Sequence, residues 1–215
     1  MTPKTILCFG DSNTHGTVPM TSLTDVRRLP HKHRWTSIMA DALGAAWYVL
    51  AEGHPGRTSV HDDPIEGAHK NAMRTLPALL ESHRPIDLVI LMLGTNDLKS
   101  RFQVSAAEIA LSVEKLVAAI RASPCGRDQN PPQVLVVAPP PLRNAGVLMD
   151  FFEGGVQKSS RFAQTFAAMG EKADVRVWDA GSACSMSHID GIHLDEEGHK
   201  ALGSALAAEV ERLDL

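Results

Sequence analysis

Short apolar runs alternate with amphipathic stretches along most of the chain. Residues 87–93 are almost continuously apolar, which is typical of a strand buried on both faces of a parallel sheet. Shorter apolar runs at 5–9, 47–51, 133–138 and 176–178 predict four more strands. A segment long enough to contain a helix separates each strand from the next, so the pattern predicts repeated strand–helix–strand units.

The segments between these strands have the spacing of amphipathic helices. At 34–43, Trp35 and Met39 fall on one apolar face and are expected in the core, and Gly44 fits the end of a helix. At 105–108 the sequence Ser-Ala-Ala-Glu is a capping box, which opens a helix running to about residue 122. Further helices are predicted at 71–80, at 156–169, and from a cap at Asp195 to about 213.

Strands joined by helical crossovers give a parallel sheet that is covered on both faces. We therefore expect an α/β fold, a three-layer α/β/α sandwich, formed by one domain over 1–215. Two stretches, 124–132 and 139–155, have no regular pattern. The second contains Phe151 and Phe152, and it is predicted to be a mobile or intersubunit loop.

Composition narrows the class of protein. The chain is 44% hydrophobic and 21% charged, as globular proteins are, and its net charge is −4 with scattered basic residues. Nucleic acid and anionic membranes are therefore excluded as expected partners. Cys8, Cys125 and Cys184 are an odd number without CxxC spacing, which indicates free thiols in a reducing cytoplasm. No signal-peptide pattern or long apolar run is present, so we expect a soluble cytoplasmic protein.

Four glycine-containing polar segments come directly after predicted strands or shortly before the last helix. Ligands of open α/β sheets bind outside the carboxyl ends of the strands, so these segments are expected to meet at one edge of the sheet. They are Gly10-Asp11-Ser12-Asn13, Gly53-His54-Pro55-Gly56, Gly94-Thr95-Asn96-Asp97 and Asp190-Gly191-Ile192-His193.

Ser12 and His193 can supply nucleophilic chemistry at this edge. Ser12 falls where a helix begins, and the unpaired N–H groups of a helix start favour negative charge. Asp190 precedes His193 by three residues, a spacing that lets its carboxylate hold the imidazole Nδ1–H. Taken singly, Ser12 could be a helix cap and the Asp-x-x-His sequence a surface turn.

Two further residues can stabilise developing negative charge. The amide of Asn96 leaves the end of the most apolar strand, and a glycine at 56 lets its backbone N–H approach an oxygen closely. Together with the N–H of Ser12 they predict a three-donor oxyanion hole. Each residue alone is also what an ordinary turn would contain.

These four segments, in this order over positions 10–193, resemble the invariant blocks of the SGNH (GDSL-like) hydrolase family. The resemblance implies that Ser12, Asp190 and His193 form the triad and that Ser12, Gly56 and Asn96 form the oxyanion hole. It also implies a five-stranded parallel sheet in flavodoxin-like order. The chain is most similar to the bacterial arylesterase/acyltransferase group, which implies a homo-oligomer, octamers included.

The chain departs from the family pattern around the nucleophile. Asn13 replaces the usual leucine, Glu52 stands where an asparagine is common, and His15 and Thr17 replace bulky aromatic residues. These changes are expected to make the mouth of the site wider or more polar. We predict that Asn13, His15 and Thr95 contact the substrate.

Other candidate residues are less specific. The ten histidines lack a metal-binding spacing, so no metal and no other cofactor is expected. Lys99 and Arg101 could contact an acidic group of the substrate, but a solvated loop is the favoured interpretation.

The sequence thus predicts a serine esterase for short-chain aryl or alkyl esters, a small-molecule substrate, with possible acyl transfer to alcohols. The same triad could instead serve a carbohydrate or other O-acetyl deacetylase, a thioesterase or a lysophospholipase. A phosphate-binding flavodoxin-like module is disfavoured because Gly10-Asp11-Ser12-Asn13 lacks the glycine-rich cradle and lysine. An ordinary α/β-hydrolase is disfavoured because no Gly-x-Ser-x-Gly sequence occurs.

Overall fold

The computed structural model describes residues 2–213, so Met1, Asp214 and Leu215 of the predicted domain lie outside the described residues. One five-stranded, all-parallel sheet runs through it in the order β2-β1-β3-β4-β5. This confirms the expected α/β fold and its flavodoxin-like strand order. The strands are β1 (Lys4–Gly10), β2 (Trp47–Gly53), β3 (Leu88–Met92), β4 (Gln133–Ala138) and β5 (Arg176–Asp179).

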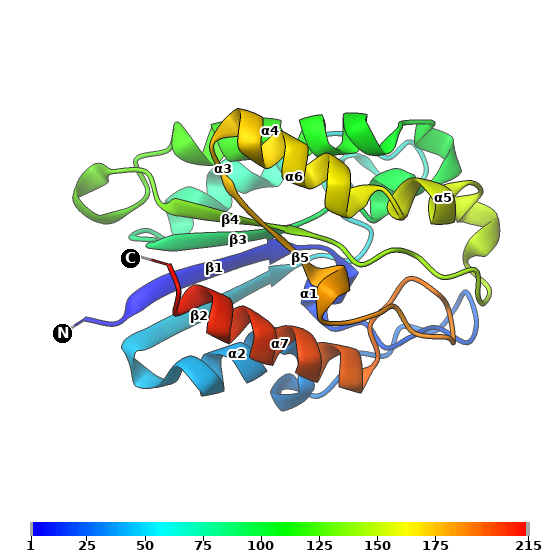
Figure 1. Cartoon of the computed structure of the whole chain (residues 1–215), viewed down its shortest axis with the longest axis horizontal. Coiled ribbons are helices and arrows are strands. Elements are labelled where there is room, and N and C mark those ends of the chain that lie inside the picture. Colours follow the sequence, from blue (N-terminus) through cyan, green and yellow to red (C-terminus); the bar gives the residue numbers. More distant parts are fainter. Residues whose placement is uncertain (1, 214–215) are drawn as a thin grey trace.

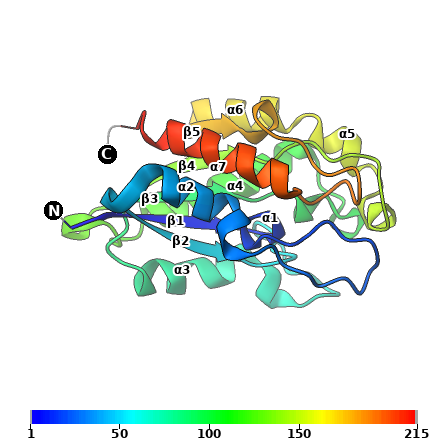
Figure 2. The same cartoon turned by 90° about the horizontal axis from the view of Figure 1, so that it is seen from below.

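Helices cover both faces of the sheet and make the expected three layers (Figures 1 and 2). On one face, α2 (Trp35–Leu43) packs against α7 (Glu196–Val210). On the other face, α4 (Ala106–Arg121) contacts both α3 (Ala72–Ser82) and α6 (Phe162–Ala173). All loops that follow the strands therefore reach the same edge, which is where the polar segments were expected to meet.

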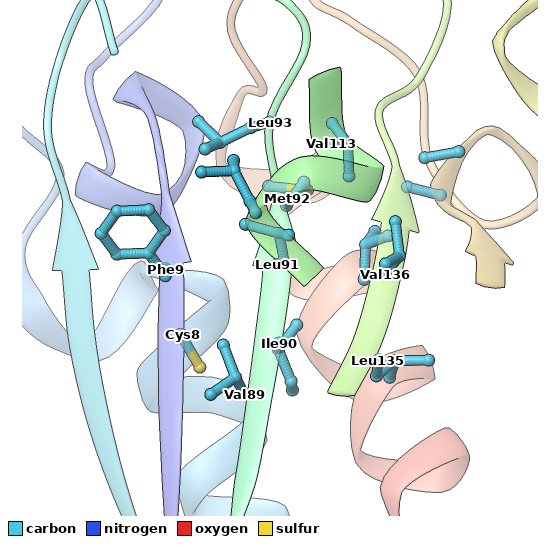
Figure 3. Close-up of a cluster of buried hydrophobic side chains, with 14 of the residues drawn as sticks. Cys8, Phe9, Val89, Ile90, Leu91, Met92, Leu93, Val113, Leu135 and Val136 are labelled. Atoms are coloured by element: carbon cyan, nitrogen blue, oxygen red, sulfur yellow. The ribbon is translucent and has the colours of Figure 1, made fainter. Parts of the chain in front are cut away.

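The central strand β3 lies in the hydrophobic core. All five of its residues are buried, and Ile90 lies opposite Cys8 of β1 and Leu135 of β4 (Figure 3). Trp35 and Met39 of α2 are 1% and 0% exposed, which confirms their expected place in the core. Burying one such large apolar side chain stabilises the fold by roughly 1.5–3 kcal/mol. The sheet thus holds the ends of its strands in fixed positions.

The predicted helix over 156–169 is wrong as a single element. Two helices occupy this region, α5 (Gly155–Ser159) and α6, and they are separated at Ser160 and Arg161. The buried Ser159 explains the interruption, because its Oγ donates to the carbonyl of Val156 at 3.0 Å and accepts the N–H of Leu142 at 2.9 Å. A serine that bonds to backbone groups competes with the helix.

The predicted cap of the last helix and the predicted free thiols agree with the structure. Asp195 caps α7 through a 2.9 Å bond from the N–H of Gly198, although α7 ends at Val210 rather than near 213. The three cysteines are buried free thiols, and burial raises the pKa of Cys184 to about 12. Across residues 2–213, no helix has both the length and the apolar character needed to cross a membrane.

Candidate active site

Ser12 is positioned by the tight connection from β1 to the short helix α1 (Ser12–His15). Asp11 caps this helix by accepting the N–H of Asn13 at 2.9 Å. The helix lies against the end of β2, where a Cβ on Gly53 would be only 2.1 Å from the backbone nitrogen of His15. Glycine at 53 therefore allows the close approach that places Ser12 at the edge of the sheet.

Ser12, His193 and Asp190 form a continuous chain of hydrogen bonds. His193 Nε2 lies 3.0 Å from Ser12 Oγ, and His193 Nδ1 lies 2.6 Å from Asp190 Oδ2. All three residues are at most 5% exposed. Burial raises the pKa of Asp190, but the hydrogen bond and charge of His193 outweigh it and hold that pKa below its usual value. An ionised Asp190 favours the imidazole tautomer with the proton on Nδ1.

The loop that carries His193 returns to Ser12 from the far edge of the sheet. It follows β5, which pairs only with β4, and it leads into α7, which lies with α2 on the face of the sheet opposite α6 (Figures 1 and 2). Asn13 secures this return, since its amide donates to the carbonyl of Ile192 at 3.1 Å and its Oδ1 accepts the N–H of Leu194 at 2.8 Å. The N–H of Met20 donates to Asp190 at 2.7 Å.

These contacts correct two of the predicted substrate contacts. Asn13 is 2% exposed and uses its amide group to hold the histidine loop, so it does not face a substrate. Thr95 is 1% exposed, and it lies outside the cavity that Ser12 lines. His15 does line that cavity, and burial together with the charges of Arg28 and Arg34 lowers its pKa to about 4.

Ser12 and His193 open into a cavity of about 560 Å³. Gly56 and Asn96 line it as well, so the structure brings together the predicted nucleophile, base and side-chain and backbone donors. Its apolar lining side chains, called the apolar wall here, are Met20, Leu23, Val26, Ile65, Leu148, Phe151, Phe152 and Ile192. Its charged lining side chains are Asp25, Glu66, Lys70, Lys99 and Arg101, and the last four are called the charged wall here.

The side-chain amide of Asn96 has an unpaired donor at the cavity. Its Nδ2 is buried and receives no hydrogen-bond acceptor from the described residues. A buried, unpaired donor of this kind costs about 1–3 kcal/mol. Gly56 adopts a left-handed conformation (φ +79°) that few other residues tolerate, and a Cβ there would lie 2.4 Å from Glu66 Oε2. Both positions therefore suit donors that await an oxygen in the cavity.

Asp97 connects the two segments that carry these donors, a role the sequence did not reveal. It accepts the N–H of Ser59 at 3.0 Å, the hydroxyl of Ser59 at 2.6 Å and Nδ1 of His61 at 2.8 Å. The hydrogen bond between His61 Nδ1 and Asp97 raises the pKa of His61. The segment after β2 is thereby fixed to the segment after β3. In the sequence, this role could have been suspected because Asp97 follows Asn96 in the third polar segment.

Lys99 and Arg101 are not in a solvated loop, contrary to the favoured interpretation. The Lys99 side chain is 8% exposed, and the Arg101 side chain is 16% exposed. Both pair with Asp63 and Glu66, from a segment 33 to 38 residues earlier in the chain. Sequence reasoning missed Asp63, Glu66 and Lys70 because nothing local marks them as neighbours of the later cations.

The histidines outside the triad form no comparable site. Ser37 Oγ lies 3.2 Å from His31 Nδ1, but neither residue lines the cavity. His33 pairs with Glu196 at 2.7 Å. Within the part of the chain that the structure describes, no group of three potential metal ligands occurs.

The fold and the site define a carboxylic ester hydrolase. The chain belongs to the GDSL-like lipase/acylhydrolase family, the SGNH hydrolases, whose model matches residues 8–201. No match was found among the curated proteins.

Solved structures agree over the full length. An M. smegmatis aryl esterase is 41% identical, with 98% of this chain and 99% of that chain covered and a TM-score of 0.93. Est24, a carbohydrate acetylesterase from Sinorhizobium meliloti, is 40% identical with 97% and 98% covered and a TM-score of 0.92. A carbohydrate acetylesterase family member from the same organism is 34% identical, with 97% of each chain covered and a TM-score of 0.88. The chain is thus an acylhydrolase related to both kinds of esterase.

Proposed function

We propose that the chain is a serine esterase that hydrolyses short-chain aryl or alkyl esters through an acyl-enzyme on Ser12. The observation that carries this proposal is the hydrogen-bonded chain from Ser12 through His193 to Asp190. It opens into the cavity beside the unpaired amide of Asn96. A nucleophile, its base and an oxyanion donor then face the same space.

In this mechanism Ser12 Oγ attacks the ester carbonyl carbon while His193 Nε2 takes the hydroxyl proton. The carbonyl oxygen becomes an oxyanion and accepts hydrogen bonds from the N–H groups of Ser12 and Gly56 and from Asn96 Nδ2. The ester C–O bond then breaks, and His193 returns the proton to the departing alcohol. Water deprotonated by His193 then attacks the acyl carbon, the bond to Ser12 Oγ breaks, and His193 returns the proton to Ser12 Oγ as the acid leaves. Asp190 stabilises the imidazolium in both steps.

A carbohydrate O-acetyl ester is the second candidate substrate. Est24 is a carbohydrate acetylesterase, and the charged wall of this cavity offers hydrogen-bond donors and acceptors to hydroxyl groups. The apolar wall, in contrast, favours an aryl or alkyl group and would let an alcohol compete with water, giving acyl transfer. Comparing ester with acid yield in aqueous alcohol tests the transfer, and acid alone at high alcohol counts against it.

We also propose a homo-oligomer. Leu23, Val26, Ile65 and Phe151 line the cavity and are 42–90% exposed, so the rim around the active site is unusually apolar. Exposed apolar patches of this kind are typical of protein interfaces.

The three free thiols support a reducing compartment such as the cytoplasm.

Replacing Ser12 tests the esterase directly. Ser12→Ala is expected to abolish hydrolysis of p-nitrophenyl acetate, and a fluorophosphonate is expected to add once to the unmodified protein, at Ser12, by mass spectrometry. Ser37→Ala is the matched control because Ser37 also contacts a histidine but lies outside the cavity. It should keep full activity. Hydrolysis by Ser12→Ala above a few per cent of the unmodified rate would remove Ser12 from its role.

A further inference from the structure

The charged wall of the cavity carries more positive than negative groups. Its cations are Lys70, Lys99 and Arg101, which are accompanied by the carboxylates of Glu66 in the lining and of Asp63, a partner of Lys99 and Arg101. Asp25 also lines the cavity, but it is neutralised by Arg27 at 2.6 Å. Asp63 is saturated, since Oδ1 accepts the N–H groups of Ile65 and Glu66, both at 2.9 Å, and Oδ2 accepts Arg101 at 2.7 Å. Glu66 pairs through Oε1 with both Lys99 and Arg101. One positive charge is left over.

The surplus charge resides on Lys70. Its ammonium donates to the carbonyl of Pro55 at 2.8 Å and lies 3.4 Å from His54 Nε2, and no carboxylate of the described residues lies within 4 Å of it. Lys70 also borders the expected oxyanion donor, because its Cε would lie 3.3 Å from a Cβ on Gly56. A partly buried ammonium without an ionic partner gains from an anion brought by a ligand.

Two histidines near this wall are uncharged at neutral pH. Burial lowers the pKa of His54 to about 4, and the charges of Lys70 and Arg57 lower it further than Glu66 restores it. His15 behaves in the same way beside Arg28 and Arg34. These imidazoles are therefore neutral at pH 7 and add no charge to the cavity. The charges of these two histidines therefore do not change near pH 7, where a substrate carboxylate would bind Lys70.

We propose that the preferred substrates are esters whose acyl or alcohol part carries a carboxylate, which Lys70 binds beside the oxyanion donors. This inference rests on the proposed esterase function and names its substrate class. Glu66 limits the preference, because its carboxylate occupies Lys99 and Arg101, which could otherwise bind the same anion.

Matched ester pairs test the preference on each side of the ester bond. For the alcohol side, 4-acetoxybenzoate is compared with methyl 4-acetoxybenzoate. For the acyl side, mono-4-nitrophenyl adipate is compared with its methyl ester. The readout is the ratio of kcat/KM for the anionic ester to that for the neutral ester, after subtraction of the uncatalysed rate. Methyl 4-acetoxybenzoate has the better leaving group, so a preference for its acid cannot come from intrinsic reactivity.

Lys70→Met is expected to lower this ratio about tenfold in at least one pair, the size of one charge-assisted hydrogen bond. Lys70→Arg should keep the ratio, and Glu66→Gln should raise it by removing a competing carboxylate. The ratio of the unmodified protein should fall at high ionic strength, because salt screens the attraction. Lys200→Met is the control, since Lys200 is exposed on α7 and does not line the cavity.

A purely structural role of Lys70 in holding Pro55 would slow both members of a pair equally and leave the ratio unchanged. An unchanged ratio in both pairs for Lys70→Met, or a lower ratio for Glu66→Gln, would overturn the inference. Hydrolysis of the neutral esters by the unmodified protein keeps the proposed esterase function intact in that case. Failure to hydrolyse any of the four esters would instead count against the esterase itself.

Discussion

Two asparagines of the active-site edge have opposite tasks, although each is a buried amide beside a glycine-rich segment. Asn13 uses both ends of its amide to hold the histidine loop, while Asn96 leaves its Nδ2 unpaired in the cavity. A buried donor with no partner costs stability in the folded state until an oxygen arrives. A fully paired one contributes to the fold at all times. The two residues should therefore separate turnover from stability.

Asn96→Ala is expected to lower kcat for p-nitrophenyl acetate by about 10²–10³, the usual effect of losing one oxyanion donor. Its free energy of unfolding in urea should not fall, and loss of the buried unpaired donor should raise it by up to about 1–3 kcal/mol. Asn13→Ala provides the contrast, because it leaves the Ile192 carbonyl and the Leu194 N–H unpaired and should cost about 1–3 kcal/mol of stability for each group left buried. An unchanged kcat for Asn96→Ala would assign the oxyanion role elsewhere.

Sequence predicted the identity of such residues better than their orientation. Ser12, His193, Gly56 and Asn96 were found because each lies in a polar segment after a strand or before the last helix, and parallel strands bring those segments to one edge. The direction of a side chain depends on neighbours from distant segments. The position of Asn13 next to Ser12 therefore did not reveal that its side chain holds the histidine loop.

At the level of elements, the local signals were sufficient wherever capping or continuous apolarity set the boundary. The capping box expected at 105–108 is present, with Glu108 N–H donating to Ser105 Oγ at 3.2 Å and Ser105 N–H donating to Glu108 Oε2 at 2.7 Å. The interrupted helix at 156–169 was missed because its break depends on Leu142, a contact that no local pattern contains. Long-range hydrogen bonds are what sequence periodicity cannot show.

Ser105→Ala is expected to reduce the free energy of unfolding by about 1 kcal/mol, because the first turn of α4 loses an N-cap acceptor. Since α4 lies on the outer layer and Ser105 does not line the cavity, kcat/KM for p-nitrophenyl acetate should be unchanged. Glu108→Gln is the control, as glutamine can still accept the N–H of Ser105. Urea denaturation measures both, and an unchanged free energy of unfolding in Ser105→Ala would show that this cap does not stabilise the helix.

At the scale of the whole molecule, a buried hydrogen bond joins α2 and α7, the two helices packed together on one face of the sheet. His199, on α7, is 0% exposed, and its Nδ1 accepts the N–H of Trp35 at the start of α2 at 3.2 Å. Burial is the main cause that lowers the pKa of His199 to about 4, and together with the charge of Arg34 it outweighs the attraction of Asp195. The packing of these two helices therefore requires a neutral imidazole.

This requirement makes the stability of the fold depend on pH. The folded-state pKa of His199 lies below the unfolded value of about 6.5, so the unfolded chain takes up a proton that the folded chain refuses as the pH falls through this window. Stability from His199 is thus present above about pH 6.5 and lost toward pH 4. The loss between pH 7.5 and pH 5 is about 2 kcal/mol for this residue.

His199→Gln removes the titrating group while its amide oxygen can still accept the N–H of Trp35. The variant is expected to lose less stability than the unmodified protein between pH 7.5 and pH 5, by about 2 kcal/mol in urea denaturation. His69→Gln is a suitable control, because His69 is an exposed histidine outside this helix pair. An identical pH dependence in His199→Gln and in the unmodified protein would show that the α2–α7 contact tolerates a charged imidazole.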